Sequence, residues 1–187
     1  MESLLFIRHA ETDLAGRFCG HSDPPINERG YRQIEELLET LDTESIDAIY
    51  SSDLSRASAT ANAIGRTIGL TPIVVPTLRE MNFGVWEGLS WDEIEARDQT
   101  YARRWSNSYP DIPAPGGETF AAFQSRVLTE VRRILALASR KSAVVVTHAG
   151  VMRVVLQLLC DLDEKSAWER TSAYCGSFRY HPGGSCD

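Results

Sequence analysis

The sequence predicts an α/β fold with a mostly parallel central sheet and helices on both faces of that sheet. Three short, largely apolar runs, at 4–7, 46–50 and 143–146, are typical of strands buried in a parallel sheet. A segment with helical periodicity follows each run, which favours βαβ units. The carboxyl ends of parallel strands meet at one edge of such a sheet, and ligands bind there.

The composition is that of a globular protein. Of the 187 residues, 43% are hydrophobic and 24% are charged, so we expect one domain over residues 1–187 with a sizeable core. The net charge of −7 argues against a nucleic acid or a membrane surface as partner, because both would repel the chain. No apolar run has the length of a membrane span, and the N-terminus lacks a signal-peptide pattern. We therefore expect a cytoplasmic protein, and nothing in the sequence indicates its oligomeric state.

The four cysteines are widely spaced along the chain. They are Cys19, Cys160, Cys175 and Cys186, and no two of them form a Cys-x-x-Cys pair. This spacing favours free thiols in a reducing compartment over a disulfide framework or a zinc site. We therefore expect neither a metal ion nor another cofactor.

The first part of the chain alternates strand, loop and helix. The strand at 4–7 ends in a loop over 13–25 that is rich in Gly, Pro, Asp and Ser. Asn27 can cap the next helix, whose apolar residues recur every three or four positions. After the strand at 46–50, Asp53 can cap a second amphipathic helix.

The middle of the chain predicts a small insertion. A third strand is expected at 72–75. Residues 90–115 then hold several aromatic residues and three prolines without a long period, which predicts short helices and loops that form a lid above the sheet. A strong amphipathic helix follows, with a core-facing side that begins at Phe120 and reaches Ala138.

The last part of the chain returns to the sheet. The run at 143–146 is uniformly apolar, so its strand is expected to be central, and a helix at 151–159 follows it. Residues 178–181 predict a final strand at an edge of the sheet. The tail at 182–187 is expected to be loose.

Residues that can handle a phosphoryl group follow these strands. Arg8 and His9 come directly after the first strand, and His148 follows the run at 143–146. An imidazole can attack an electrophile, and a guanidinium can hold a phosphoryl group by two parallel hydrogen bonds. Arg56 falls in the first turn of a helix, where the helix dipole disfavours a cation unless an anion compensates. The alternatives are a histidine that is merely packed and an arginine that is solvated.

Four motifs together resemble the histidine phosphatase superfamily, which includes the cofactor-dependent phosphoglycerate mutases. They are Arg-His-Ala-Glu-Thr at 8–12, Ser-x-x-x-Arg-Ala at 52–57, Arg-Glu-x-x-x-Gly-x-Trp-Glu-Gly at 79–88 and Thr-His-x-Gly-Val at 147–151. The resemblance covers nearly the whole chain. It implies a three-layer, phosphoglycerate mutase-like fold.

The resemblance also implies a role for each matching residue. His9 would be the nucleophile that forms a phosphohistidine, and Arg8, Arg56 and His148 would surround the phosphoryl oxygens. The second ring nitrogen of His9 would then have to donate to a fixed acceptor, which we expect to be a backbone carbonyl. Glu80 matches the position of the acid and base that serves the leaving group and the water.

Other residues compete with or complete this set. Glu87 and Glu11 are the nearest rivals of Glu80 for the acid/base role, and an ordinary salt-bridged glutamate is the structural alternative. The residues expected to contact the substrate are Cys19, Gly20, His21 and Ala149, although an exposed loop histidine is an equally good interpretation of His21.

The implied activity is hydrolysis of a phosphate monoester of a small metabolite. The chain lacks the longer insertion of the mutases, which favours release of the phosphoryl group to water. Segments 18–24, 80–87 and 116–120 are similar to the α-ribazole phosphatases of cobalamin assembly and to broad-specificity members. The alternatives are mutase-type phosphoryl transfer, a non-catalytic module that binds phosphorylated ligands, and a metal site, which two flanking arginines would oppose.

Overall fold

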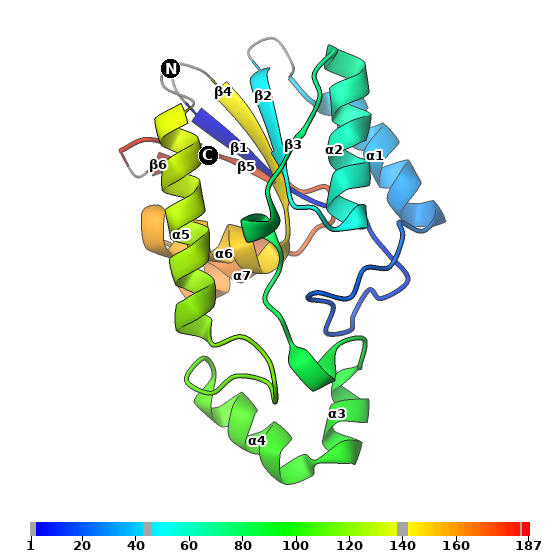
Figure 1. The fold of residues 1–187 in the computed structure, drawn as a ribbon, viewed down its shortest axis with the longest axis vertical. Coiled ribbons are helices and arrows are strands. Elements are labelled where there is room, and N and C mark those ends of the chain that lie inside the picture. Colours follow the sequence, from blue (N-terminus) through cyan, green and yellow to red (C-terminus); the bar gives the residue numbers. More distant parts are fainter. Residues whose placement is uncertain (1–2, 43–45, 138–141, 184) are drawn as a thin grey trace.

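A six-stranded sheet forms the centre of the molecule (Figure 1). The computed structural model describes residues 3–42, 46–137, 142–183 and 185–187. In the described residues the strands are β1 (Ser3–Arg8), β2 (Ile46–Ser51), β3 (Ile73–Val74), β4 (Ser142–Thr147), β5 (Ser177–His181) and β6 (Ser185–Cys186), in the spatial order β3-β2-β4-β1-β5-β6. The first four strands are parallel, and β5 and β6 are antiparallel to their neighbours. The predicted α/β class and the central position of β4 are confirmed.

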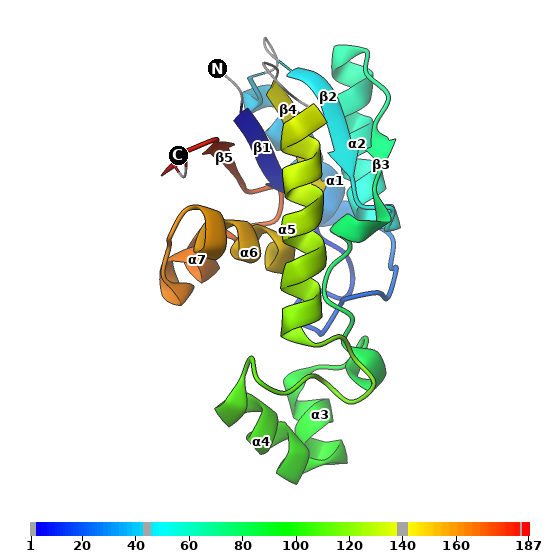
Figure 2. The same ribbon diagram turned by 60° about the vertical axis from the view of Figure 1, so that its left-hand side comes forward.

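Helices cover both faces of the sheet, as expected (Figures 1 and 2). They are α1 (Glu28–Thr40), α2 (Ser55–Ile68), α3 (Trp91–Arg97), α4 (Gln99–Ser108), α5 (Phe120–Leu137), α6 (Ala149–Leu159) and α7 (Glu164–Arg170), with short 3₁₀ turns at Pro76–Leu78 and Gly84–Trp86. Successive strand residues point to opposite faces. Leu5 and Ile7 of β1 therefore pack with α1 and α2, whereas Leu4 and Phe6 pack with α5 and α6.

The insertion at 90–115 contains α3 and α4, which lie beyond the carboxyl ends of the strands (Figure 1). Its interior is a separate aromatic cluster in which Trp86 and Ile94 are buried and Phe18, Trp91 and Trp105 pack around them. The prediction of short helices above the strand ends is confirmed. Closure of this segment as a lid stays a prediction.

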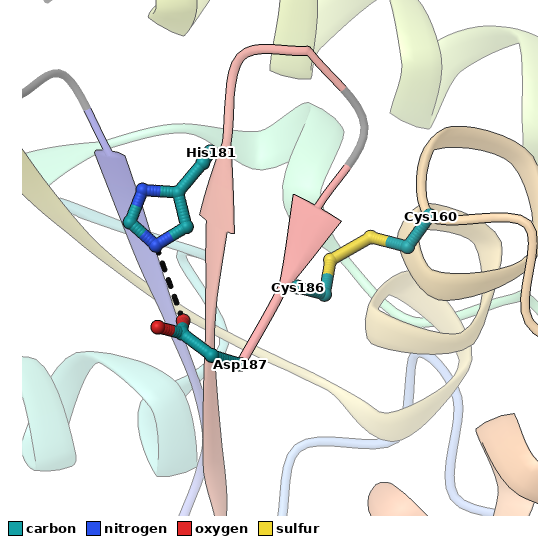
Figure 3. The surroundings of a disulfide bond; sticks show 4 residues. All are labelled: Cys160, His181, Cys186 and Asp187. Carbon is teal, nitrogen blue, oxygen red and sulfur yellow. Dashed lines mark hydrogen bonds and ion pairs between the residues drawn. A yellow bond between two sulfur atoms is a disulfide. The ribbon is translucent and has the colours of Figure 1, made fainter.

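The C-terminal tail differs from expectation. Residues 185–186 form β6 against β5, so β5 is an inner strand rather than an edge strand. A disulfide joins Cys160 at the end of α6 to Cys186, beside a contact of 3.2 Å between His181 and Asp187 (Figure 3). The prediction of four free thiols is therefore wrong for these two cysteines, because folding brings together residues 26 positions apart in the sequence.

The start of α2 also differs from expectation. Asp53 does not cap α2, whose N-cap is Leu54, because its carboxylate instead pairs with Arg79 at 2.7 Å. The carboxylate of Asp23, in a distant loop, accepts the N–H of Ser55, also at 2.7 Å.

Ala138, the last residue predicted for the core-facing side of the long amphipathic helix, lies outside the described residues. In the part of the chain that is described, no helix is both long and apolar enough to cross a membrane.

Candidate active site

The three parallel strands β1, β2 and β4 bring the predicted phosphoryl-handling residues to one edge of the sheet. His9 directly follows β1, and its N–H donates to the carbonyl of Thr147 in β4 at 2.9 Å. His148 follows β4 as the N-cap of α6. The rings of the two histidines lie 5.0 Å apart, centre to centre, and Arg56 contacts His9 from the first turn of α2. His9, Arg56 and His148 are all buried.

The His9 ring is held as a neutral imidazole. Nδ1 lies 2.7 Å from the carbonyl of Ala10. Because a carbonyl oxygen can only accept, Nδ1 carries the proton and Nε2 keeps its lone pair. Burial, and secondly the charge of Arg56, hold the pKa of His9 well below its ordinary value. The expected partner of the second ring nitrogen, a backbone carbonyl, is thus the carbonyl of Ala10.

Arg56 is fully buried, so its interpretation as a solvated arginine is wrong. Its guanidinium donates to the carbonyls of Ser22 at 2.6 Å, Gly20 at 2.7 Å and Cys19 at 3.3 Å. Its Nε lies 3.3 Å from Nε2 of His9. The loop at 19–22 therefore directs a cation at Nε2 of His9.

Glu87 holds the loop at 19–22 in place through hydrogen bonds to its backbone. Its carboxylate accepts the N–H groups of Gly20, His21, Ser22 and Phe83 at 2.8–3.1 Å. Burial raises the pKa of Glu87, but the N–H donors, led by Ser22, outweigh burial and hold this pKa below its ordinary value. An ionised carboxylate with its lone pairs occupied is a loop anchor, and this geometry does not support Glu87 as a rival of Glu80.

Arg8 is held by the segment at 171–174. Its Nη1 donates to the carbonyls of Thr171 and Ser172, and the guanidinium carbon lies 3.8 Å from the centre of the Tyr174 ring. The Nε of Arg8 is buried and has no hydrogen-bond partner among the described residues. Burial lowers the pKa of this guanidinium from its ordinary value.

His148 also presents an unused nitrogen. Its Nε2 lies 2.9 Å from the hydroxyl of Ser52, whereas Nδ1 is buried without a partner in the described part of the chain. Burial, and then the neighbouring His9 and Arg56, hold the pKa of His148 well below its ordinary value. Buried polar atoms are nearly always paired, so the free nitrogens of His148 and Arg8 indicate a bound ligand with acceptor oxygens.

Glu80 contacts the first turn of α6. Its two oxygens accept the N–H groups of Met81 and Gly150, each at 2.9 Å. Gly150 must be small, because a Cβ at that position would lie 2.1 Å from Oε1 of Glu80. The third glutamate, Glu11, contacts Arg29 at 3.5 Å and accepts a hydrogen bond from the side chain of Asn27 at 3.3 Å.

An open space of about 340 Å³, the central hollow, lies beside Arg8, His9 and Glu80, whereas the fully buried Arg56 and His148 do not line it. It is lined by Arg8, His9, Thr12, Leu14, Gly16, Arg17, Phe18, Cys19, Glu80, Phe83, Ala149, Arg153, Trp168 and Tyr174. The predicted contacts Cys19 and Ala149 thus line the central hollow. Gly20 and His21 do not, and Gly20 instead supplies a carbonyl to Arg56.

Sequence analysis missed four contributors to the site. Ser52 holds His148, and Arg153, Trp168 and Tyr174 form one wall of the central hollow. Arg153 lies three residues beyond Gly150, so helical spacing after the Thr-His motif could have placed it on the same face of α6. Trp168 lies on α7, a seven-residue helix that no long hydrophobic period predicts. Among the described residues there is no group of three His, Cys, Asp or Glu side chains that could hold a metal ion.

Comparison with known proteins gives consistent matches. The family model of the histidine phosphatase superfamily (branch 1) matches residues 4–185. Phosphoserine phosphatase 1 of Hydrogenobacter thermophilus is 31% identical over 90% of this chain and 81% of its own length. The adenosylcobalamin/alpha-ribazole phosphatase of Escherichia coli is 30% identical over 88% of this chain and 82% of its own length.

The fold has solved counterparts as well. The crystal structure of the alpha-ribazole phosphatase from Shigella flexneri superposes with a TM-score of 0.87 at 27% sequence identity. That match covers 98% of this chain and 93% of the solved chain. Together with the relatives in sequence, it supports a phosphatase function.

Proposed function

This chain belongs to the histidine phosphatase superfamily, and we propose that it hydrolyses the phosphate monoester of a small metabolite through a phosphohistidine on His9. One observation carries the proposal. A buried, neutral imidazole faces two guanidiniums and a second imidazole, and two buried nitrogens of that set, on Arg8 and His148, are unpaired.

In the first step Nε2 of His9 attacks phosphorus, and the bond from phosphorus to the ester oxygen breaks. Nδ1 keeps its proton and donates it in a hydrogen bond to the carbonyl of Ala10, so the positive charge that develops on the ring is stabilised. Glu80 gives its proton to the departing oxygen. The products of this step are the free alcohol and the phosphoenzyme.

In the second step water attacks the phosphoryl group and the bond from phosphorus to Nε2 breaks. The carboxylate of Glu80 takes a proton from the water, and the electron pair of the broken bond returns to His9. Inorganic phosphate leaves, and Glu80 is protonated again for the next cycle.

Fixed positive charge on Arg8 and Arg56 and a neutral N–H donor on His148 are the main contributions of the surrounding residues. All three would meet the equatorial oxygens, where charge is spread during phosphoryl transfer. Ser52 can donate to Nε2 of His148, which leaves the proton of that ring on Nδ1, directed at an oxygen. Two guanidiniums beside His9 would repel a divalent cation, so we propose a metal-independent reaction.

The relatives direct the choice of substrates. One is named for phosphoserine and another for alpha-ribazole phosphate, so α-ribazole 5′-phosphate and O-phosphoserine are the first candidates to examine.

The test is phosphate release from 4-nitrophenyl phosphate, O-phosphoserine and α-ribazole 5′-phosphate, with and without EDTA. We expect EDTA-resistant release, loss of release in His9→Ala, and an acid-labile phosphoenzyme in the wild type. Release by His9→Ala at the wild-type rate would refute the nucleophile. Transfer of the phosphoryl group to a second hydroxyl instead of water would identify a mutase, and binding without turnover would identify a non-catalytic module.

A further inference from the structure

A second, smaller space lies beside the central hollow. This aromatic cavity has a volume of about 150 Å³. Its walls include five aromatic side chains: Phe83, Tyr109, Phe120, Phe123 and Trp168. Phe83 precedes the 3₁₀ turn at Gly84–Trp86, and the others come from the insertion, from α5 and from α7, which are far apart in the sequence.

The aromatic cavity adjoins the central hollow at Glu80. Glu80, Phe83, Arg153 and Trp168 line both spaces. His9 lines only the central hollow. Because Glu80 would protonate the leaving oxygen, the rest of the leaving alcohol has to continue on the side of Glu80, and the aromatic cavity begins there.

We propose that the aromatic cavity binds a ring of the leaving alcohol, so that the preferred substrates are phosphate esters of alcohols that carry an aromatic or heteroaromatic ring. This inference rests on the proposed function, because it assigns the leaving-group side of the same reaction. An apolar cavity of about 150 Å³ is the size that holds one benzene ring. Aromatic walls also favour such a ring through edge and offset contacts.

The surfaces at the cavity favour the same occupant. Trp168 is 56% exposed and Tyr109 is 43% exposed, although both are large aromatic residues. A ring in the aromatic cavity would cover part of each. Apolar surface that stays exposed beside a site typically marks a place where a ligand binds.

The charges in the cavity favour a neutral ring over a second charged group. Arg153 donates to Thr171 at 3.0 Å and stacks on Trp168 with 3.5 Å between the guanidinium carbon and the ring centre. Glu164 lines the same cavity and carries the opposite charge. Glu80 also lines the cavity, and it carries a proton when it acts as the acid of the first step; the formal charges of Arg153 and Glu164 then cancel, so no surplus charge is left to select an anionic or cationic leaving group.

The experiment compares alkyl esters whose leaving alcohols have similar acidity. We would measure kcat/KM for 2-phenylethyl phosphate, propyl phosphate and O-phosphoserine. Burying one ring should favour 2-phenylethyl phosphate over propyl phosphate by about 10- to 100-fold. O-phosphoserine, which has no ring, should fall near propyl phosphate.

A cavity-filling variant supplies the structural control. Gln157 lines the aromatic cavity and is only half-buried, so the indole of Gln157→Trp can enter the cavity. This variant should bring kcat/KM for 2-phenylethyl phosphate to within about threefold of kcat/KM for propyl phosphate. The neighbouring Leu158 is exposed and does not line the cavity, so Leu158→Trp should keep the wild-type preference.

The outcomes separate the two proposals. Equal kcat/KM for the phenyl and propyl esters, a preference for O-phosphoserine, or an unchanged preference in Gln157→Trp would each overturn the cavity assignment and leave the phosphatase proposal standing. If no ester is hydrolysed above His9→Ala, the proposed function is wrong. Calorimetric titration with 2-phenylethyl and propyl phosphonates then tests whether the cavity binds a ring. Tighter binding of the phenyl compound would support this assignment, and equal binding would overturn it.

Discussion

Replacing Gly150 with alanine should displace Glu80 and leave the remainder of the site in place. The new Cβ would lie 2.1 Å from Oε1 and 2.9 Å from Cδ of Glu80. Non-bonded carbon and oxygen atoms need more than 3 Å, so the carboxyl group would have to move by about 1 Å. That movement breaks the bond of 2.9 Å from the Gly150 N–H to Oε2.

The expected loss depends on the leaving group. A positioned acid contributes about 10²- to 10⁴-fold, equivalent to about 3–5 kcal/mol in the transition state. We therefore expect kcat/KM for an alkyl phosphate to fall by about 10²-fold or more in Gly150→Ala. The 4-nitrophenolate ion departs without a proton, so kcat/KM for 4-nitrophenyl phosphate should fall by less than about tenfold.

Stability and a second variant provide the controls. Alanine is favoured over glycine in a helix by up to about 1 kcal/mol, which offsets part of the lost hydrogen bond, so the free energy of unfolding should decrease by no more than about 2 kcal/mol. Glu80→Gln should show the same dependence on the leaving group, and the double variant should be no worse than Glu80→Gln alone. Equal losses with both substrates would refute displacement of Glu80 as the cause.

The remaining predictions concern pH, the buried cation and the disulfide. The pKa values of His9 and His148 lie below the ordinary 6.5 because of burial, so the unfolded chain binds more protons than the folded protein at and below that pH. Stability should therefore fall as the pH drops below about 6.5, by up to about 1.4 kcal/mol per pH unit for each ring, and urea unfolding of His148→Asn should show a shallower slope. The same low pKa keeps Nε2 of His9 unprotonated, so kcat/KM for 4-nitrophenyl phosphate, corrected for ionisation of the substrate, should show no acid limb at pH 6.5. Arg56→Lys keeps the charge but cannot reach two loop carbonyls and His9 together, so we expect about 3 kcal/mol less stability in urea and loss of most activity. Reduction of the Cys160–Cys186 bond, which spans 26 residues, should lower the free energy of unfolding by about 3.5 kcal/mol, whereas a double serine variant should not respond to dithiothreitol.

The sheet, and the edge at which His9 and His148 lie, could be predicted from the sequence. Strands that are buried on both faces appear in the sequence as uninterrupted apolar runs. The run at 143–146 predicted a central strand, and β4 lies between β1 and β2. Once those three strands are parallel, the residues that follow them have to meet, which is why His9 and His148 could be placed together from the sequence.

The elements that sequence reasoning missed depend on distant contacts. β6 contains two residues and exists only as a partner of β5, so no local pattern marks it. The disulfide to Cys186 requires that strand to lie beside the end of α6. Asp53 has the residue type of a good cap, but its ion pair with Arg79 removes it from that role.

Arg56 shows that a cation at a helix start can be oriented by groups other than the expected anion. Among the described residues its guanidinium donates to neutral backbone carbonyls, and the nearest Asp23 oxygen is 4.0 Å away, so the anion expected from the sequence stays a prediction. Thr171 and Ser172 hold Arg8 in the same way. Carbonyl dipoles orient a guanidinium without cancelling its formal charge, so both cations remain available to a phosphate dianion. This explains how a chain of net charge −7 can keep a positive pocket, and it predicts that giving Arg8 or Arg56 a carboxylate neighbour would weaken phosphate binding even where the fold is unchanged.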